Sequence, residues 1–304
     1  MQGALYPPLK PYLRINIRLL IFSMNLLFLI IIFTALGGVL SVLAASVFLL
    51  LSDENQAKVL PHGVSFATGA LLAVAFWGLI PHAFEEVGSA QIQTLSGTIM
   101  LGLLVFFILE KLLIWRHCHS GSCEVHGDIE EHSHGHAHSH GSHKSAGTMI
   151  IIGDSIHNFV DGVLIAAAFL TDIKLGIVTS LAVAAHEIPQ EVGDFAILLH
   201  SGYSKTKALL YNVLASLTTV IGGILAYYSL GDIHDSLPYF LALASSSFIY
   251  IAVADLIPTL HKKTDIKTSL KQIALIFAGI CLIVSLHGVA HDIQLEGIES
   301  EVQH

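Results

Sequence analysis

The chain has 304 residues, of which 54% are apolar and 12% are charged, and its mean hydropathy is +0.72. A soluble domain carries about 25% charged residues, so this composition excludes most soluble proteins. The formal net charge of −9 comes with no basic face for nucleic acid, and three cysteines are too few for a disulfide framework. The unusual residue is histidine, with 19 copies against 14 lysines and arginines together.

Residues 1–23 precede the first clean apolar run, which Met24 begins, and we expect them to form an N-terminal extension. Runs of about 20 apolar residues, the length that spans a hydrocarbon core, then recur along the chain. In lipid such runs satisfy their backbone only as helices, so the sequence predicts an all-α integral membrane protein with eight transmembrane helices. The predicted helices cover residues 25–51, 64–84, 95–115, 148–170, 175–200, 206–230, 238–260 and 269–290.

The distribution of positive charge predicts the orientation of these helices. The connections after the first, third, fifth and seventh helices hold ten of the 14 lysines and arginines, and the other side holds four. Positive residues favour the cytoplasmic side, so both termini are predicted to be extracytoplasmic, in a plasma or inner cell membrane. The predicted organisation is one membrane domain, with helices 1–3 in residues 24–115 and helices 4–8 in residues 148–304.

Residues 116–147 form the long connection between the third and fourth helices and contain nine of the 19 histidines. The segment is rich in glycine and serine and lacks apolar periodicity, which predicts a disordered cytoplasmic loop. Imidazole groups at this density bind divalent metals such as zinc, although a polar linker without a ligand is the alternative. The candidate metal-binding residues in the loop are His132, His134, His136, His138 and His140.

The predicted fourth and fifth helices carry polar side chains in the middle of their apolar runs. A charged side chain at mid-bilayer costs between about 3 and 10 kcal/mol, so this concentration needs an explanation. A divalent cation would neutralise the carboxylates, and neutral imidazole would complete its coordination. The alternative is a hydrogen-bonded network of histidine and carboxylate, as in proton-linked carriers. The polar residues are Asp154, His157, Asn158 and Asp161 on the fourth helix, and His186, Glu187, Gln190, Glu191 and Asp194 on the fifth.

Pro189 and two glycines are expected to shape the contact between these helices. Pro189 lacks an amide proton and should kink the fifth helix, which frees the Ala185 carbonyl towards the polar residues. Gly162 and Gly193 are predicted to let the two helices approach each other closely.

The motifs HNFVDG (157–162) and HEIPQEVGDF (186–195) resemble the signature fourth and fifth helices of the ZIP family of divalent-metal transporters. The eight helices, outward termini and histidine-rich loop are similar too, so the resemblance covers the chain from about Met24. It implies a transport site that takes His157 and Asp161 from the fourth helix and His186, Glu187 and Gln190 from the fifth, with Asn158 adjacent.

Two departures from the family pattern are visible. Many ZIP proteins have a carboxylate or a histidine where Gln190 stands, so Glu191 is expected either to bind metal in its place or to serve the exit path. Some relatives also carry a glutamate on the sixth helix that helps to form a second metal site. Only serine and threonine occur in the corresponding part of this chain, so one principal site is expected.

Two acidic residues outside the central motifs are candidates for the ion pathway. Asp255, in the seventh helix, matches an acidic pathway position of the family. Glu85 lies at the outer end of the second helix beside His82 and Glu86, where it would gather cations, although polar residues are common at membrane surfaces. The second and seventh helices also both contain the triplet Leu-Ile-Pro near their ends, a similarity that an internal repeat would explain.

The leading function is a secondary transporter that moves Zn²⁺, or Fe²⁺, Mn²⁺ or Cd²⁺, into the cytoplasm as its substrate, without a prosthetic group and without enzyme activity. No GxxxxGK[ST] motif indicates use of ATP. One alternative is a metal exporter of the cation-diffusion-facilitator kind. The other is an intramembrane zinc metalloprotease, because HEIPQE resembles HExxH with Gln190 in place of the second histidine.

The expected partners are the metal ion and the lipid bilayer, with no nucleic acid. The small residues Gly37, Gly38, Gly222 and Gly223 permit close helix contacts, either within one subunit or between the subunits of a homodimer.

Overall fold

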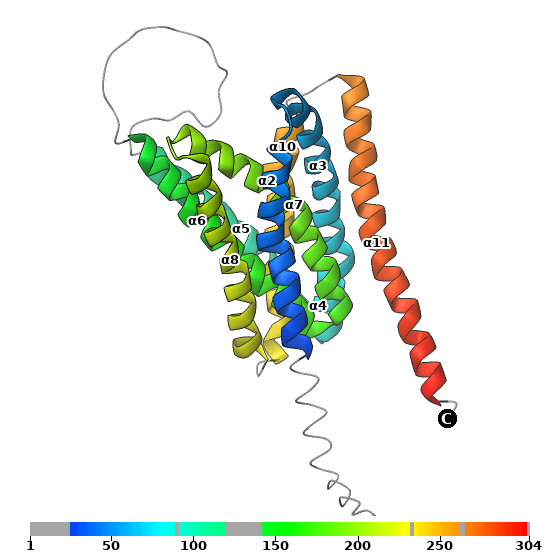
Figure 1. Cartoon of the computed structure of the whole chain (residues 1–304). Helices are drawn as coiled ribbons and strands as arrows, with labels where there is room; N and C mark the ends of the chain where they lie inside the picture. The colour runs from blue at the N-terminus through cyan, green and yellow to red at the C-terminus, as the bar shows by residue number, and fades with distance from the viewer. Residues whose placement is uncertain (1–24, 89–90, 119–141, 232–233, 262–264, 303–304) are drawn as a thin grey trace, which may run out of the picture.

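A computed structural model describes residues 25–88, 91–118, 142–231, 234–261 and 265–302, and these residues contain helices and no strand (Figure 1). The five histidines proposed to bind metal in the loop lie outside the described residues. Residues 25–35 are helical and continue into η1 (Leu36–Leu40) and α2 (Ser41–Phe48). The following elements are α3 (Asp53–Ala73), η2 (Val74–Leu79), α4 (Ile80–Glu86), α5 (Ile92–Cys118), α6 (Ser142–Thr171), α7 (Ile173–His200), α8 (Lys205–Leu230), η4 (His234–Ser236), α9 (Leu237–Tyr250), η5 (Ile251–Leu256), α10 (Ile257–Leu260) and α11 (Ile266–Val302).

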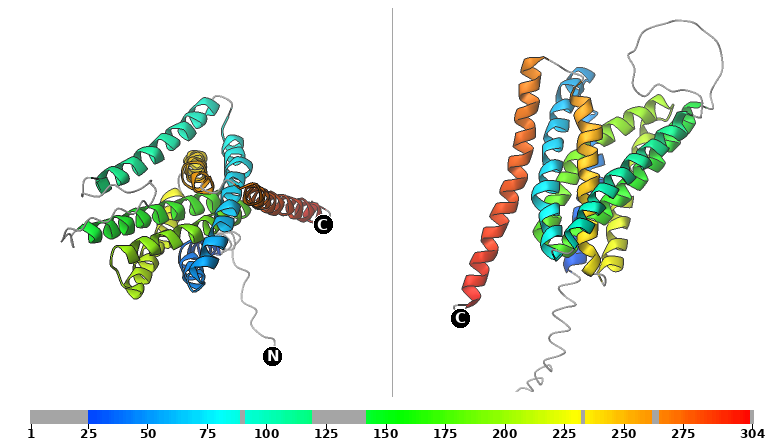
Figure 2. Two further views of the ribbon diagram at one scale, coloured as in Figure 1. Left: turned by 90° about the horizontal axis from the view of Figure 1, so that it is seen from above. Right: turned by 180° about the vertical axis from the view of Figure 1, so that it is seen from behind.

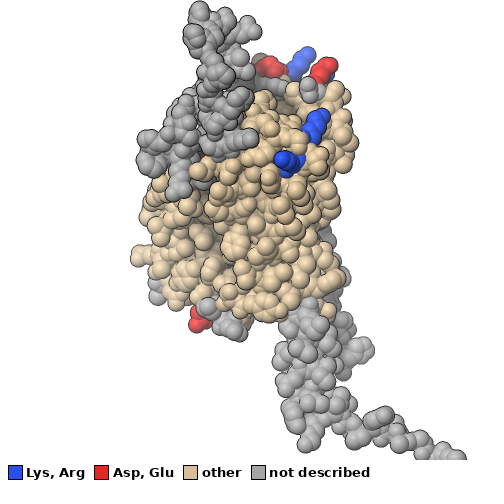
Figure 3. Space-filling model, turned by 60° about the vertical axis from the view of Figure 1, so that its left-hand side comes forward, with Lys and Arg blue, Asp and Glu red and all other residues tan. Residues whose placement is uncertain are grey.

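Seven helical stretches of the described chain are long and apolar enough to cross a membrane. The predicted helix 175–200 forms as α7 but is not among the seven, and its second half carries Glu187, Glu191 and Asp194. On the face drawn in Figure 3, the described charged residues lie at the two ends, with a band free of them between. The protein is therefore an integral membrane protein. The seven stretches are Asn25–Phe48, Glu54–Glu86, Ile92–Leu112, Gly147–Thr171, Lys205–Leu230, Leu237–Leu260 and Ile266–Gly288.

A single residue, Asp172, separates α6 from α7. Its carboxylate accepts hydrogen bonds from the backbone amides of Lys174 and Leu175 at 2.8 and 2.9 Å, which caps the start of α7. Because the connection is so short, the two helices must run antiparallel and pack as neighbours. The turn therefore fixes which residues of α6 and α7 lie at the same depth.

The closest helix contact near these residues is between α6 and α8, and glycines make it possible. A Cβ atom on Gly162 would lie 1.9 Å from the Thr219 carbonyl oxygen, and one on Gly222 would lie 2.2 Å from that of Phe159. The prediction that Gly162 and Gly193 bring α6 against α7 is therefore wrong. Gly162 faces α8, and nothing lies within 4 Å of a Cβ added to Gly193.

The other small residues also pack inside the chain. A Cβ atom on Gly37 would meet Val183 of α7, and one on Gly38 would meet the Ser216 carbonyl of α8. Gly223 faces Thr34 in the first helix. These glycines are used within one subunit, so they carry no argument for the predicted homodimer.

The remaining helices pack around this group in two pairs, as the views in Figures 1 and 2 show. The long helix α11 lies on the outside against α3, where added Cβ atoms on Gly69 and Gly279 would strike the partner backbone at 2.0 and 2.3 Å. Helix α5 packs against α9, and Ser246 of α9 donates a hydrogen bond to the Ile99 carbonyl at 2.9 Å.

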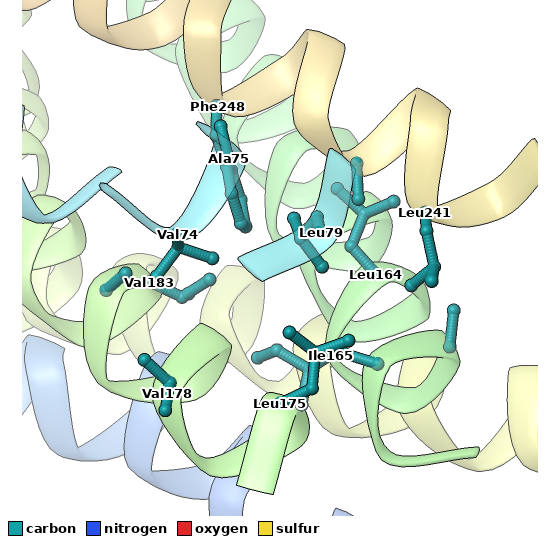
Figure 4. Close-up of a cluster of buried hydrophobic side chains, with 14 of the residues drawn as sticks. Val74, Ala75, Leu79, Leu164, Ile165, Leu175, Val178, Val183, Leu241 and Phe248 are labelled. Carbon is teal, nitrogen blue, oxygen red and sulfur yellow. The ribbon is translucent and has the colours of Figure 1, made fainter. Parts of the chain in front are cut away.

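The two Leu-Ile-Pro triplets occupy the same local structure. Each triplet begins at the last residue of a six-residue π-helical segment, η2 or η5, and its proline lies in the first turn of the helix that follows. In both, the isoleucine donates its amide to an alanine carbonyl five residues earlier, from Ile80 to Ala75 and from Ile257 to Ala252. Figure 4 places Val74, Ala75 and Leu79 of η2 in the buried apolar core beside Phe248 of α9.

Candidate metal site

The site residues of α6 and α7 lie at matching depths because of the turn at Asp172. His157 is 15 residues before Asp172 and His186 is 14 residues after it. With a rise of about 1.5 Å per residue, both histidines lie about 21–23 Å along their helices from the turn. Asp161 shares the face of His157 at i, i+4, and Glu187 follows His186 directly, so imidazole and carboxylate from both helices meet near mid-helix.

Four side chains converge at this point. The Nε2 atom of His157 lies 3.4 Å from Oε1 of Glu187 and 3.9 Å from Oδ2 of Asp161. The Nε2 atom of His186 lies 3.4 Å from Oδ2 of Asp161 and 3.5 Å from Oε1 of Glu187. Each residue offers one ligand atom, and all four atoms lie within 4.8 Å of one another.

The distances between these four atoms match the distances between ligand atoms around a tetrahedral metal ion. Ligand atoms 2.0–2.2 Å from a tetrahedral zinc ion are about 3.3–3.6 Å from each other. Three of the four nitrogen–oxygen distances, and the 3.4 Å between the Nε2 atoms of His157 and His186, lie in this range. Only small movements of His157 or Asp161 would be needed for one ion to contact all four side chains.

The environment of the four side chains also favours a cation. His186, Asp161 and Glu187 have side chains that are at most 1% exposed, and only His157 keeps 23%. All four carboxylate oxygens of Asp161 and Glu187 are buried without a hydrogen-bond partner. Buried carboxylates without partners are costly, and a metal ion would remove that cost.

The orientation of the His186 ring leaves one nitrogen available to a metal. Its Nδ1 atom lies 3.3 Å from the Ala182 carbonyl oxygen, which can only accept a hydrogen bond. Nδ1 therefore carries the proton in the neutral ring, and the lone pair of Nε2 points at the cluster.

Asn158 and Gln190 take different positions from these four residues. The Asn158 amide donates to Oδ1 of Asp154 at 2.8 Å, and its oxygen accepts a hydrogen bond from Thr219 at 2.7 Å. Asn158 is buried and fully engaged with these neighbours. Gln190 is half-buried on α7, one turn after His186.

In Figures 1 and 2, α7 changes direction along its length, as expected for a helix with Pro189 in its interior.

A second group of possible ligands adjoins the first. Oxygen atoms of Asp154, Glu187 and Glu191 lie within 4.8 Å of one another, and Glu187 belongs to both groups. The sequence marked Asp154 as polar but not as a candidate ligand. The signal that could have identified it is its position one turn before His157, on the side of α6 that also presents Asp161.

Neither of the two candidate pathway residues is a member of the four-residue cluster. Glu85 is exposed on α4, which ends at Glu86, and Asp255 is exposed in η5. His82 lies near Glu85, and its ring meets that of His287 on α11 edge to face, with centroids 5.4 Å apart. Helix α4 and helix α11 therefore bring polar groups together at one end of the bundle.

Comparison with known proteins finds a zinc-transporter family and zinc transporters as relatives. Residues 20–287 match the family model described as ZIP zinc transporter. The chain is 31% identical over 251 residues to zinc transporter ZIP13 of Pongo abelii, covering 77% of this chain and 69% of that protein. It is 31% identical over 295 residues to zinc transporter zipt-7.2 of Caenorhabditis elegans, covering 82% of this chain and 64% of that protein. A 117-residue stretch is 45% identical to human zinc transporter ZIP4, covering 38% of this chain and 18% of that protein.

Proposed function

Because the chain belongs to the ZIP family of zinc transporters, we propose that it moves zinc, or a similar divalent ion, across a membrane into the cytoplasm. Proteins of this family are transporters and not enzymes, which removes the metalloprotease alternative. The observation that carries the proposal is the convergence of His157, Asp161, His186 and Glu187 on one buried point.

The proposed path requires α7 to cross the membrane as the eighth helix. Its length of 28 residues is sufficient, and its polar residues face neighbours, since His186, Glu187 and Glu191 are all buried. A helix whose polar side is covered by protein need not be apolar all round. With eight helices, both termini lie on the extracytoplasmic side of a plasma or inner membrane, and residues 119–141 join α5 to α6 on the cytoplasmic side.

In the proposed mechanism, the ion exchanges its water for the two imidazoles and two carboxylates of the cluster. Two carboxylates cancel the double positive charge of the ion, so the loaded site is close to neutral, which favours its burial. Gln190 and Glu191 are proposed as further oxygen ligands along the path, Asn158 as a ligand or a support for one, and Glu85 and Asp255 as pathway residues. The loop histidines would receive or buffer zinc in the cytoplasm.

The site chemistry admits several metals. Imidazole and carboxylate bind Zn²⁺, Fe²⁺, Mn²⁺ and Cd²⁺, and selection among them depends on geometry and availability. Zinc is proposed first because the separations fit a tetrahedral shell and because the matched family is described as zinc transporters.

Zinc uptake into liposomes tests the proposal. Purified protein is reconstituted, a fluorescent zinc indicator is trapped inside, and wild type is compared with His157→Ala and His186→Ala. We expect zinc flux in wild type and at least about tenfold slower flux in both variants. Glu54→Gln, whose side chain is 79% exposed on α3, is the control and should match wild type. No flux in wild type, or equal flux in all variants, contradicts the proposal. Net loss of zinc from intact cells that express the protein would favour the exporter alternative.

A further inference from the structure

His82 of α4 and His287 of α11 lie side by side at one end of the bundle, although they are far apart in the sequence. The close packing of α3 against α11 brings them together, since a Cβ atom on Gly69 would lie 2.0 Å from the Ile276 carbonyl oxygen. His82 is 13 residues after Gly69, and His287 is 11 residues after Ile276. With a rise of about 1.5 Å per residue, both histidines lie about 16–20 Å beyond that contact. The two helices therefore run parallel here and present both rings at the same depth.

The spacing of the two rings suits a shared metal ion. Their centroids are 5.4 Å apart and their planes meet at 84°. His157 and His186 of the four-ligand cluster are related in nearly the same way, with centroids 5.7 Å apart and planes at 82°. If the zinc–nitrogen distance is about 2.0–2.1 Å and the nitrogen lies about 1.1 Å from the ring centre, two imidazoles on one tetrahedral zinc ion have centroids about 5.2 Å apart.

The orientation of the His82 ring leaves one nitrogen available to a metal. Its Nδ1 atom lies 2.9 Å from the Gly78 carbonyl oxygen, which can only accept a hydrogen bond, so Nδ1 carries the proton of the neutral ring. A backbone carbonyl on the other ring nitrogen is the usual support of a metal-binding histidine. Both His82 and His287 are half-buried, and Glu86 follows His82 at i, i+4 with an exposed side chain. A carboxylate on the same face of α4 is therefore available to the ion.

We propose that His82 and His287 bind one divalent metal ion between α4 and α11, with Glu86 and water completing its coordination. Imidazole ligands select borderline ions such as Zn²⁺, Ni²⁺ and Cu²⁺. None of the three residues belongs to the four-ligand cluster, so this ion is held for structure and is not on the transport path. It joins the end of α4 to α11, the helix on the outside of the bundle. Only the location of the site on the extracytoplasmic side rests on the proposed function.

Thermal unfolding of the full-length protein in detergent, over a series of Zn²⁺ concentrations and with EDTA, tests this site. The parent protein carries His157→Ala, which weakens zinc binding at the four-ligand cluster. To it are added His82→Gln, His287→Gln, both together, or the control His200→Gln. His200 is exposed on α7, and its Nδ1 atom contacts the Ala196 carbonyl at 2.8 Å as that of His82 contacts Gly78.

We expect Zn²⁺ to raise the melting temperature of the parent and of the His200→Gln control equally. His82→Gln and His287→Gln should each need at least about tenfold more Zn²⁺ for the same rise. The double variant should need no more than the single variants, because either substitution already breaks the shared site.

Every other pattern overturns the site. If Zn²⁺ does not stabilise the parent, or stabilises either His82→Gln or His287→Gln as well as the parent, the two histidines do not share an ion. If these variants lose the same stability with Zn²⁺ and with EDTA, the rings only pack against each other. The melting temperatures are measured without transport, so the expected pattern together with no zinc flux in wild-type liposomes supports this site and contradicts the proposed function.

Discussion

His157 of α6 and His186 of α7 meet across the helix interface with their rings edge to face, the centroids 5.7 Å apart. Both are flanked by carboxylates, and His157 is the one member of the cluster that keeps some exposure. His157 is therefore the side chain through which an arriving ion would first contact the site.

Asp161→Asn is expected to raise the thermal stability of the metal-free protein and to slow zinc transport. The Asp161 carboxylate is buried without a hydrogen-bond partner, so its charge costs energy in the metal-free protein. The amide variant should be more resistant to heat without metal, yet should transport zinc at least about tenfold more slowly because an anionic ligand is lost. Thermal unfolding in detergent and uptake in liposomes measure the two effects. Unchanged uptake would remove Asp161 from the site.

Zinc uptake is expected to weaken as the external pH falls. A metal ion and a proton compete for the same nitrogen or oxygen atoms, because imidazole and carboxylate ligands bind metal only in their deprotonated forms. The KM for zinc should therefore rise between about pH 7.5 and about pH 5.5. Initial uptake rates over a series of free zinc concentrations at each pH give the KM. A KM that stays constant over this range would contradict direct ligation by histidine.

Gly162→Ala is expected to destabilise the contact between α6 and α8. The added Cβ would lie 1.9 Å from the Thr219 carbonyl oxygen, so the helices must separate, which should cost about 1–3 kcal/mol. Gly97→Ala in α5 is the matched control, since nothing lies within 4 Å of its added Cβ. Thermal unfolding of both variants in detergent measures the difference. Equal melting temperatures would show that α6 and α8 pack less closely than the 1.9 Å separation implies.

Tyr250→Phe is expected to weaken the contact between α5 and α9. The Tyr250 hydroxyl donates a hydrogen bond to the Glu110 carboxylate across these helices. Its loss should lower the free energy of unfolding by about 1–2 kcal/mol and leave the KM for zinc unchanged. Tyr228→Phe, at a side chain that is 66% exposed, is the control. A changed KM with unchanged stability would instead assign Tyr250 to the ion path.

Replacing the five candidate loop histidines with asparagine should reduce zinc binding without abolishing transport. The variant lacks the imidazoles of His132, His134, His136, His138 and His140 but retains the buried cluster. Equilibrium dialysis should find fewer zinc ions bound per chain, and liposome uptake should continue. Complete loss of uptake would mean that the loop is part of the transport path.

Much of the helical layout could be predicted from the sequence, because turns and caps are local signals. The predicted helices 175–200 and 206–230 agree closely with α7 and α8, whose starts are capped by Asp172 and Ser204. The predicted helix 64–84 is shorter than the observed stretch Asp53–Glu86. Hydropathy detects only the apolar part of a helix, and polar residues continue the helix beyond it.

Part of the candidate site was also predictable, because helical spacing and a short turn are local signals in the sequence. The i, i+4 spacing of His157 and Asp161 and the short turn before α7 bring together the four side chains of the candidate site. The face that each residue presents to a third helix was not predictable from spacing. The sequence therefore misassigned the contact of Gly162, and it did not group Asp154 with Glu187 and Glu191.

The π-helical segments η2 and η5 each accommodate one more residue in a turn than an α-helix does. Deleting a single residue within a regular α-helix would rotate everything beyond it by about 100°. Deleting one from Val74–Leu79 would instead remove the extra residue and restore α-helical winding, so His82 and Glu85 would keep nearly the faces that they present now. These two segments are therefore the places in the bundle where the loss of one residue disturbs the helices least.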